Sequence, residues 1–161
     1  MSIIDTLITD RAATDVVKLK ALMAKDFATM GAAEQEAWLL DSKGAYNASD
    51  MNRVGTALNY LKQMLVHDCG AMLNWTAKTN WVYTDIPTLT QIQQYAQQIS
   101  SVRNALVVPE GTANAPAISK LTWQQANDIE RILQVCDQLI KNVKAVFKYT
   151  NAAECCVGGL I

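Results

Sequence analysis

The sequence predicts an all-α fold, a helical bundle with three long amphipathic helices and two shorter N-terminal helices. Apolar residues recur at alternating steps of three and four along three segments, and each segment opens with a capping residue. Of the 161 residues, 50% are hydrophobic and 18% are charged, which is enough for one buried core. We therefore expect one helical-bundle domain over residues 1–150 and a flexible tail over residues 151–161.

Two short helices are expected ahead of Gly44. The first runs roughly over residues 15–27, where apolar residues are spaced to share one face. The second covers about residues 32–40 and carries Trp38. Gly44 follows it and would end it, because glycine readily adopts the left-handed conformation found after helices.

The first long helix is expected between Ser49 or Asp50, which are alternative N-caps, and Gly70, which would end it. Its apolar stripe consists of Met51, Val54, Leu58, Leu61 and Leu65. Gly55 lies inside this helix, where glycine costs about 1 kcal/mol relative to alanine. We expect Gly55 to allow the close approach of a neighbouring element.

The next segment, residues 71–87 (AMLNWTAKTNWVYTDIP), has no helical period and is expected to be either a small β-excursion or an irregular loop. It carries Trp75, Trp81 and Tyr83 among polar residues. Such aromatic side chains either cover one open end of the bundle, serve as interface anchors, or form stacking surfaces for sugars and bases. All three interpretations remain open at this stage.

Two capping boxes open the remaining long helices, at Thr88–Gln91 and Thr122–Gln125, separated by the proline-containing connector of residues 107–120. The first helix has the apolar stripe Ile92, Tyr95, Ile99, Val102 and Leu106. The second extends to about Tyr149 with the stripe Ala126, Ile129, Leu133, Cys136, Ile140, Val143 and Phe147. This regular spacing favours left-handed bundle packing, with or without a partner chain.

Several asparagines lie at or inside helices, although asparagine is a poor helix former. They are Asn47, Asn52, Asn59 and Asn127, of which Asn47 is most simply a turn residue. Arg53 and Asp128 are charged neighbours of these positions, and we expect that they pair across helices.

Composition argues against several functional classes. Fourteen Lys and Arg against 15 Asp and Glu, without a basic stripe, predict no nucleic-acid binding. No apolar run approaches the ~18 residues that span a bilayer, and the N-terminus lacks a signal-peptide pattern, so no membrane partner and a reducing cytoplasm are expected.

No motif predicts catalysis or a cofactor. His67 is the single histidine, and no zinc-like spacing of cysteines or phosphate-binding glycine loop is present. Cys136 is expected to be a small core residue, and Cys155 and Cys156 to be inert residues of the tail. We therefore expect a non-enzymatic protein without catalytic, cofactor-binding or metal-binding residues.

Three stretches together carry a family resemblance: residues 43–61 (KGAYNASDMNRVGTALNYL), 78–88 (KTNWVYTDIPT) and 121–133 (LTWQQANDIERIL). With the opening SIIDTLITDR, they resemble a family of small proteins from phages and prophages of Gram-positive gut bacteria, whose genes lie near those for tail and baseplate parts. The resemblance covers nearly the whole chain, and the family it points to has no assigned activity. It implies a virion or tail-region structural protein, assembled in the bacterial host cytoplasm into a larger symmetric object.

Two hypotheses about function follow. The first is a structural or adaptor protein of the virion that forms a homo-oligomer and binds other virion proteins. The alternative is a phage-encoded binding protein that sequesters a small host signalling molecule or inhibits a host defence protein. The candidate contacts for a partner or small-molecule ligand are Trp75, Trp81, Tyr83 and Arg53, in a pocket that two subunits could share.

Overall fold

The computed structural model describes residues 2–39, 42–118 and 121–157, with side chains up to Val146. The described residues form five α-helices and two short 3-10 helices and contain no strand, which confirms the predicted all-α bundle. In chain order these elements are η1 (Ile3–Thr6), α1 (Ala13–Met23), η2 (Phe27–Thr29), α2 (Ala32–Leu39), α3 (Ala48–Cys69), α4 (Leu89–Asn104) and α5 (Trp123–Val157).

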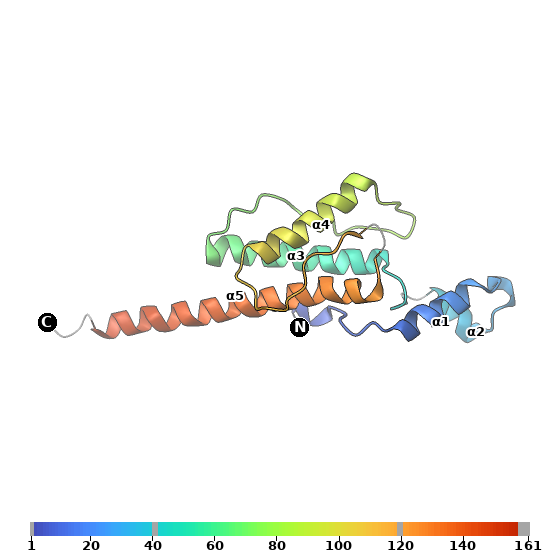
Figure 1. Cartoon of the computed structure of the whole chain (residues 1–161), viewed down its shortest axis with the longest axis horizontal. Coiled ribbons are helices and arrows are strands. Elements are labelled where there is room, and N and C mark those ends of the chain that lie inside the picture. Colours follow the sequence, from blue (N-terminus) through green and yellow to red (C-terminus); the bar gives the residue numbers. More distant parts are fainter. Residues whose placement is uncertain (1, 40–41, 119–120, 158–161) are drawn as a thin grey trace.

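The core lies between α3, α4 and the first half of α5, which contact one another in all three pairs (Figure 1). Most residues of the apolar stripes predicted for these helices face this core and exclude water from it, which is the main driving force for the packing. The exceptions among the described side chains are Val143, which is 37% exposed, and Leu106, which lies beyond the end of α4 at Asn104. Among its members with little or no exposed surface are Val54, Leu58, Leu61, Leu65, Ile99, Val102, Ile129, Leu133, Cys136 and Ile140. The 3-10 helix η1 closes one side by burying Ile4 and Leu7 against the same cluster.

The molecule is elongated because two parts extend away from this core in opposite directions (Figure 1). One is a hairpin, residues 13–39, in which α1 and α2 pack on each other. Neither helix has a buried residue, although Met30 between them is buried. The other is the second half of α5, which continues past the bundle.

Helix boundaries in the N-terminal half differ from the expected ones. Helix α1 ends at Met23, before the predicted position 27, and Phe27 instead opens η2, where the Asp26 carboxylate accepts a hydrogen bond from a following amide. Helix α3 begins after Asn47 and not at Ser49 or Asp50. The reason is that the Asp50 carboxylate accepts a hydrogen bond from the Asn47 backbone N–H at 2.8 Å, which stabilises a first turn that begins two or three residues earlier.

Glycine 70 ends α3 as predicted, with φ of 67° in the left-handed region and its amide bonded to the Leu65 carbonyl. Residues 71–87 then run as an extended, irregular segment, so the β-excursion considered from the sequence is wrong. The capping boxes of α4 and α5 are both present, with Thr88 and Thr122 bonded to Gln91 and Gln125.

Helix α5 is longer than the sequence indicated. Its predicted end near Tyr149 was too early, since it continues to Val157, and residues 151–157, expected to be a loose tail, are helical. No glycine or proline interrupts the chain between Trp123 and Val157, so helix propensity alone permits this length. The side chains of Phe147, Cys155 and Cys156 and all of residues 158–161 lie outside the described residues.

Candidate functional site

The aromatic segment forms a strap, defined here as residues 71–88, which runs antiparallel along α3. Two asparagines of α3 hold it through its backbone. The Asn59 amide accepts from the Ala77 N–H at 2.8 Å and donates to the Ala77 carbonyl at 3.0 Å. The Asn52 amide does the same for Trp81, at 2.7 and 2.8 Å. These pairs satisfy backbone groups that have no strand partner.

Gly55 lies between these two asparagines and makes the close approach possible. A Cβ atom at this position would collide with the Lys78 carbonyl oxygen of the strap. Asn52, Gly55 and Asn59 are spaced by three and four residues and therefore share one face of α3. The expectation that Gly55 admits a neighbouring element is confirmed, and that element is the strap.

The three aromatic residues of the strap have different environments. Trp81 is only 6% exposed and belongs to the core cluster, whereas Tyr83 is 94% exposed. Trp75 is half-buried against the core, with the Lys62 ammonium 5.7 Å from its ring centroid. The Lys78 ammonium lies 4.0 Å from the Trp81 ring centroid, a distance at which cation–π attraction is significant. Trp81 thus covers the core, while Tyr83 faces solvent.

Two shallow recesses flank the strap. One, of about 330 Å³, lies between the strap and the start of α3 and includes Tyr46, Met51, Trp81 and Tyr83. The other is the strap–α4 groove, defined by two adjoining hollows of about 130 and 330 Å³. Both of its parts include Thr76, Gln94 and Gln98; its lining also contains Trp75, Lys78, Trp81, Gln91, Tyr95, Gln97 and Ser101.

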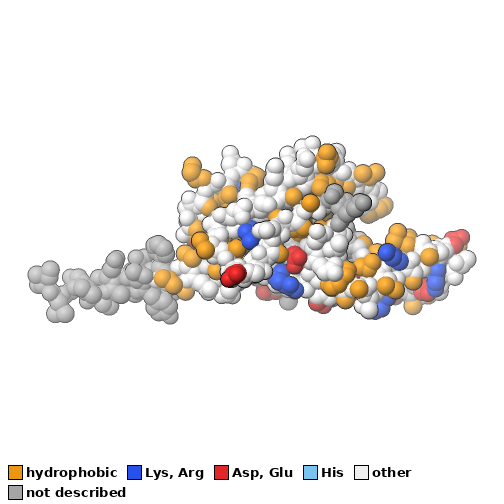
Figure 2. Space-filling model, in the orientation of Figure 1, with side chains coloured by type: hydrophobic (Ala, Val, Ile, Leu, Met, Phe, Trp, Pro, Cys, Tyr) orange, Lys and Arg blue, Asp and Glu red, His pale blue; other side chains and the backbone are white. Residues whose placement is uncertain are grey.

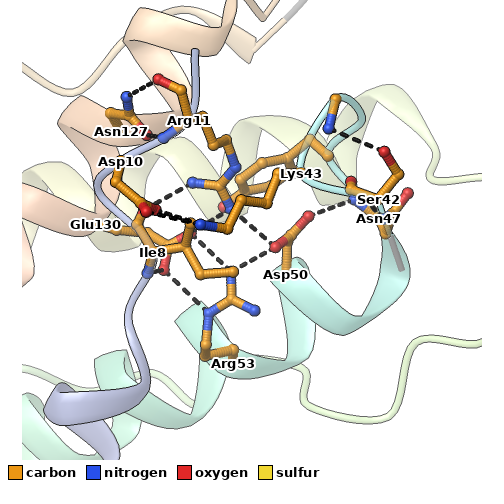
Figure 3. A network of polar contacts seen from close by, with 12 residues as sticks. Ile8, Asp10, Arg11, Ser42, Lys43, Asn47, Asp50, Arg53, Asn127 and Glu130 are labelled. Atoms are coloured by element: carbon orange, nitrogen blue, oxygen red, sulfur yellow. Dashed lines mark hydrogen bonds and ion pairs between the residues drawn. The ribbon is translucent and has the colours of Figure 1, made fainter. Parts of the chain in front are cut away.

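Arg53 does not line either hollow. It belongs to a buried ion-pair cluster, defined as Arg11, Asp50, Arg53 and Glu130 (Figure 3). Glu130 is completely buried, and its Oε1 accepts from Arg11 at 2.6 Å and from Arg53 at 2.8 Å. Its Oε2 accepts from Nε of Arg53 at 3.0 Å and from the Ile8 amide at 2.6 Å.

The expected pairing of Arg53 with Asp128 is wrong. Asp128 and Glu130 are two residues apart on α5 and therefore point to different faces of the helix. Glu130 faces α3 and bonds Arg53, while Asp128 lies 3.9 Å from Arg131 on its own helix. Burial lowers the pKa of Arg53, but the hydrogen bonds and charges of Glu130 and Asp50 outweigh it and raise that pKa above its usual range.

Asp50 and Asn127 complete the surroundings of Arg11. Oδ1 of Asp50 accepts from both guanidinium groups, at 2.8 Å from Arg11. Asn127 of α5 binds the backbone of Arg11, accepting from its N–H at 3.0 Å and donating to its carbonyl at 2.9 Å. Two positive and two negative side chains therefore cancel inside the protein, as buried charges require.

The cluster attaches the N-terminal segment to α3 and α5, and its chemistry is that of a structural link. All four carboxylate oxygens of Asp50 and Glu130 accept hydrogen bonds, so neither is poised as a free acid or base. Sequence reasoning missed Arg11 and Glu130. The available signal was Glu130 itself, an acidic residue directly beside Ile129 in an apolar stripe, where an unpaired charge would be costly.

The other groups considered from the sequence show no assembled reactive site. Among the described residues, no three His, Cys, Asp or Glu side chains lie close enough together to hold a metal ion. His67 is exposed and bonds Asp68 at 2.8 Å. Burial raises the pKa of the Cys136 thiol to about 11, which fits its expected role as a small core residue. No helix in the described ranges is both long and apolar enough to cross a membrane.

The structure therefore does not bring the four predicted contact residues into one pocket. Trp81 and Tyr83 line one hollow, Trp75 and Trp81 line the strap–α4 groove, and Arg53 lies in the ion-pair cluster. Comparison of the chain with models of known protein families, with curated proteins and with solved structures found no match.

Proposed function

We propose that this chain is a non-enzymatic structural or adaptor protein of a phage or prophage particle, which assembles with copies of itself and binds other virion proteins. The observation that carries the proposal is the hairpin of residues 13–39, which projects from the bundle and exposes apolar side chains. The resemblance of residues 43–61, 78–88 and 121–133 to phage tail-region proteins supports the same role.

The hairpin is suited to an interface because several of its apolar residues are exposed, although Met30 is buried between its two helices. Val17 is 66% exposed, Met23 61% and Leu39 76%, and Phe27 and Trp38 are also exposed. Figure 2 shows hydrophobic side chains gathered among charged ones on this end of the molecule. Contiguous exposed apolar surface with a charged rim is typical of protein–protein contact sites.

The elongated shape supports assembly as well. The hairpin and the second half of α5 lie at opposite ends of the bundle, so one end of a molecule can reach a neighbour without rearrangement of the core. The described side chains of this extension, from Lys141 to Val146, are exposed, and Lys144 among them forms an ion pair with Asp68 of α3 at 2.9 Å.

The alternative, a protein that sequesters a small host molecule, has less support. Such a protein needs a pocket that encloses most of its ligand. The hollow that holds Trp81 and Tyr83 is shallow, and Arg53, the charged residue nominated for ligand contact, is already bound by Asp50 and Glu130.

Native mass spectrometry of the purified full chain tests self-assembly. We expect a defined homo-oligomer that dissociates to monomers in the triple variant Val17→Ser, Met23→Ser and Leu39→Ser. Removing three apolar contacts should reduce the free energy of association by at least about 1.4 kcal/mol, which corresponds to at least tenfold weaker association.

The control replaces apolar residues outside the hairpin that are even more exposed, Met72→Ser and Val107→Ser, at 99% and 96%. This control should keep the oligomer. Specific association with a Kd below ~10 μM would give an oligomer at that concentration, so a wild-type monomer at ~10 μM would contradict self-assembly. Equal dissociation of the hairpin variant and the control variant would contradict it as well. Absence of the chain from purified particles of its source bacterium would contradict the virion role.

A further inference from the structure

We propose that the strap–α4 groove binds a neutral oligosaccharide. The inference does not depend on the assembly of the chain, because the hairpin contributes nothing to the lining of the groove. It rests on the kinds of side chain that line the groove, on donors that lack partners, on the low charge and on the rigid attachment of the strap.

The lining combines aromatic rings with uncharged amides and hydroxyls. The polar members are Thr76, Gln91, Gln94, Gln97, Gln98 and Ser101. Of the aromatic members, Trp81 and Tyr95 are only 6% and 4% exposed, so the half-buried Trp75 is the ring that a ligand can reach. A sugar ring has apolar C–H faces that pack on aromatic rings and hydroxyl groups that both donate and accept hydrogen bonds. Glutamine amides also carry donors and an acceptor, so they match hydroxyls better than carboxylates or ammonium groups do.

Several polar groups of the groove lack partners within the described residues. Trp81 is more than nine-tenths buried, yet its indole Nε1 has no hydrogen-bond acceptor, and the same holds for Nε1 of Trp75. A buried donor without an acceptor costs about 1–3 kcal/mol. A hydroxyl oxygen of a bound sugar is a suitable acceptor for an indole N–H, but both nitrogen atoms are enclosed by the protein, so a sugar reaches them only if neighbouring side chains move.

The exposed face of α4 provides further free groups. Gln94, Gln97 and Ser101 are spaced by three and four residues and so share one face of the helix. The amides of Gln94 and Gln97 form no hydrogen bond with any described residue, while the Gln98 amide reaches the Thr76 carbonyl only at 3.3 Å. The side-chain amides of Gln94 and Gln97 can therefore bind a ligand without losing a bond inside the protein, whereas the Ser101 hydroxyl already donates to the Gln98 carbonyl at 2.9 Å.

The charge of the groove favours a neutral ligand over an anionic one. Lys78 is the single charged residue in the lining of its two hollows. Its ammonium is bonded to Asp85 at 2.9 Å and lies over the Trp81 ring, so its charge is already compensated. The hydrogen bond from Lys78 also holds the pKa of Asp85 below its usual value. A phosphate group would find no unpaired cation here.

The strap is held rigidly enough to keep this arrangement before a ligand arrives. Asn52 and Asn59 bind its backbone at two points, and the Lys62 ammonium donates to the Trp75 carbonyl at a third. Preorganisation of this kind improves affinity because less side-chain and loop freedom is lost on binding.

The test is titration of the full-length ¹⁵N-labelled protein with maltotriose, cellotriose and tri-N-acetylchitotriose, with adenosine monophosphate as the anionic probe. We expect at least one trisaccharide to bind with a Kd of about 0.1–1 mM. Binding should shift the indole N–H resonances of Trp75 and Trp81, because these groups would gain an acceptor. Stronger binding of adenosine monophosphate, or no shift with any trisaccharide at ~10 mM, ten times the weakest expected Kd, would overturn the proposal.

Substitutions on α4 locate the site. The double variant Gln94→Ala and Gln97→Ala should weaken binding at least about tenfold, whereas Gln93→Ala, an exposed amide of α4 outside the groove, should leave it unchanged. Circular dichroism spectra that match the wild type would verify folding of both. Equal affinity of the two variants would overturn the assignment. The hairpin variant should retain sugar binding, so failure of the groove and failure of self-assembly are distinguishable.

Discussion

In this protein, asparagine side chains supply the backbone hydrogen bonds that a neighbouring strand would otherwise provide. Three of them, each on a helix, accept from the N–H and donate to the carbonyl of a single residue in an extended segment. The pairs are Asn52 with Trp81, Asn59 with Ala77 and Asn127 with Arg11. Only an amide side chain offers a donor and an acceptor in the geometry of a neighbouring peptide group, which explains why a poor helix former occupies these positions.

Replacement of Asn59 by alanine tests this role. We expect the free energy of unfolding to fall by about 1–3 kcal/mol, because the Ala77 N–H and carbonyl would lose their partner while remaining largely shielded from water. Urea denaturation provides the measurement. Gln63→Ala, at an exposed position one turn further along α3, is the control and should change stability by less than about 0.5 kcal/mol. Similar effects of both substitutions would contradict the role of Asn59.

The buried ion-pair cluster gives a second prediction at the scale of a residue. Glu130→Gln should lower the free energy of unfolding by about 3–5 kcal/mol, because Arg11 and Arg53 would share one remaining carboxylate in the interior. The comparison is Asp10→Asn, which removes the exposed partner of Lys43 and should leave the free energy of unfolding nearly unchanged, because solvent screens this pair. Urea denaturation of both variants decides the matter, and a loss below 1 kcal/mol for Glu130→Gln would count against the cluster as a structural link.

Among the contacts between elements, the contact of the strap with α3 determines where the strap lies. The strap has no hydrogen bonds of a regular element, and its position depends on the face of α3 that presents Asn52, Gly55 and Asn59. Helix α4 follows immediately at Leu89, so the strap also determines where α4 begins. A shift of the strap would therefore alter the strap–α4 groove.

Gly55→Ala tests how much stability is lost when the strap is forced away from α3. Alanine should stabilise an isolated helix by about 1 kcal/mol, but its Cβ would collide with the Lys78 carbonyl, so we expect a net loss of about 1–3 kcal/mol. Thr56→Ala, exposed on the next position of the same helix, is the control for helix propensity and should be neutral or stabilising. The two thermal unfolding midpoints can be compared directly. Stabilisation by Gly55→Ala would show that the strap is not held closely against α3.

Stability is distributed unevenly over the whole molecule. The bundle of α3, α4 and the first half of α5 contains most of the buried apolar residues, whereas α1 and α2 contain none. The hairpin contacts the segment before α3 at Gly44, which packs closely on Asp15 and Leu19 of α1. The ion pair between Asp10 and Lys43 joins the two chain segments that lead into and out of the hairpin. The hairpin can therefore open or bind a partner while the core remains folded.

Hydrogen exchange checks this difference. At protein concentrations low enough to keep the chain monomeric, we expect amides of α1 and α2 to exchange at least a hundredfold faster than those of the core of α3. This ratio corresponds to about 2.7 kcal/mol of local stability. Protection of the hairpin should rise with protein concentration if it forms the interface between copies. Core-like protection of the hairpin in the dilute monomer would contradict this division of stability.

Prediction from the sequence succeeded where the signal is local. Apolar spacing identified α3, α4 and α5, and capping boxes identified the starts of α4 and α5. It failed for pairs that are distant in the chain, such as Arg11 with Glu130, because helical periodicity shows which residues share a face but not what that face contacts. The sequence shows that the aromatic residues of the strap are close together in the chain, but it does not show that their exposure differs from one to the next.

The sequence by itself determined the all-α bundle, since each long helix carries its own stripe and cap, and propensity and burial both act within a few residues. Only the tertiary structure decided the candidate sites. Trp81 is in the core while Tyr83 is in solvent, and Arg53 belongs to the ion-pair cluster. The physical reason is that the strap has no period of its own, so its path, and with it the groove along α4, depends on hydrogen bonds to asparagines on another element.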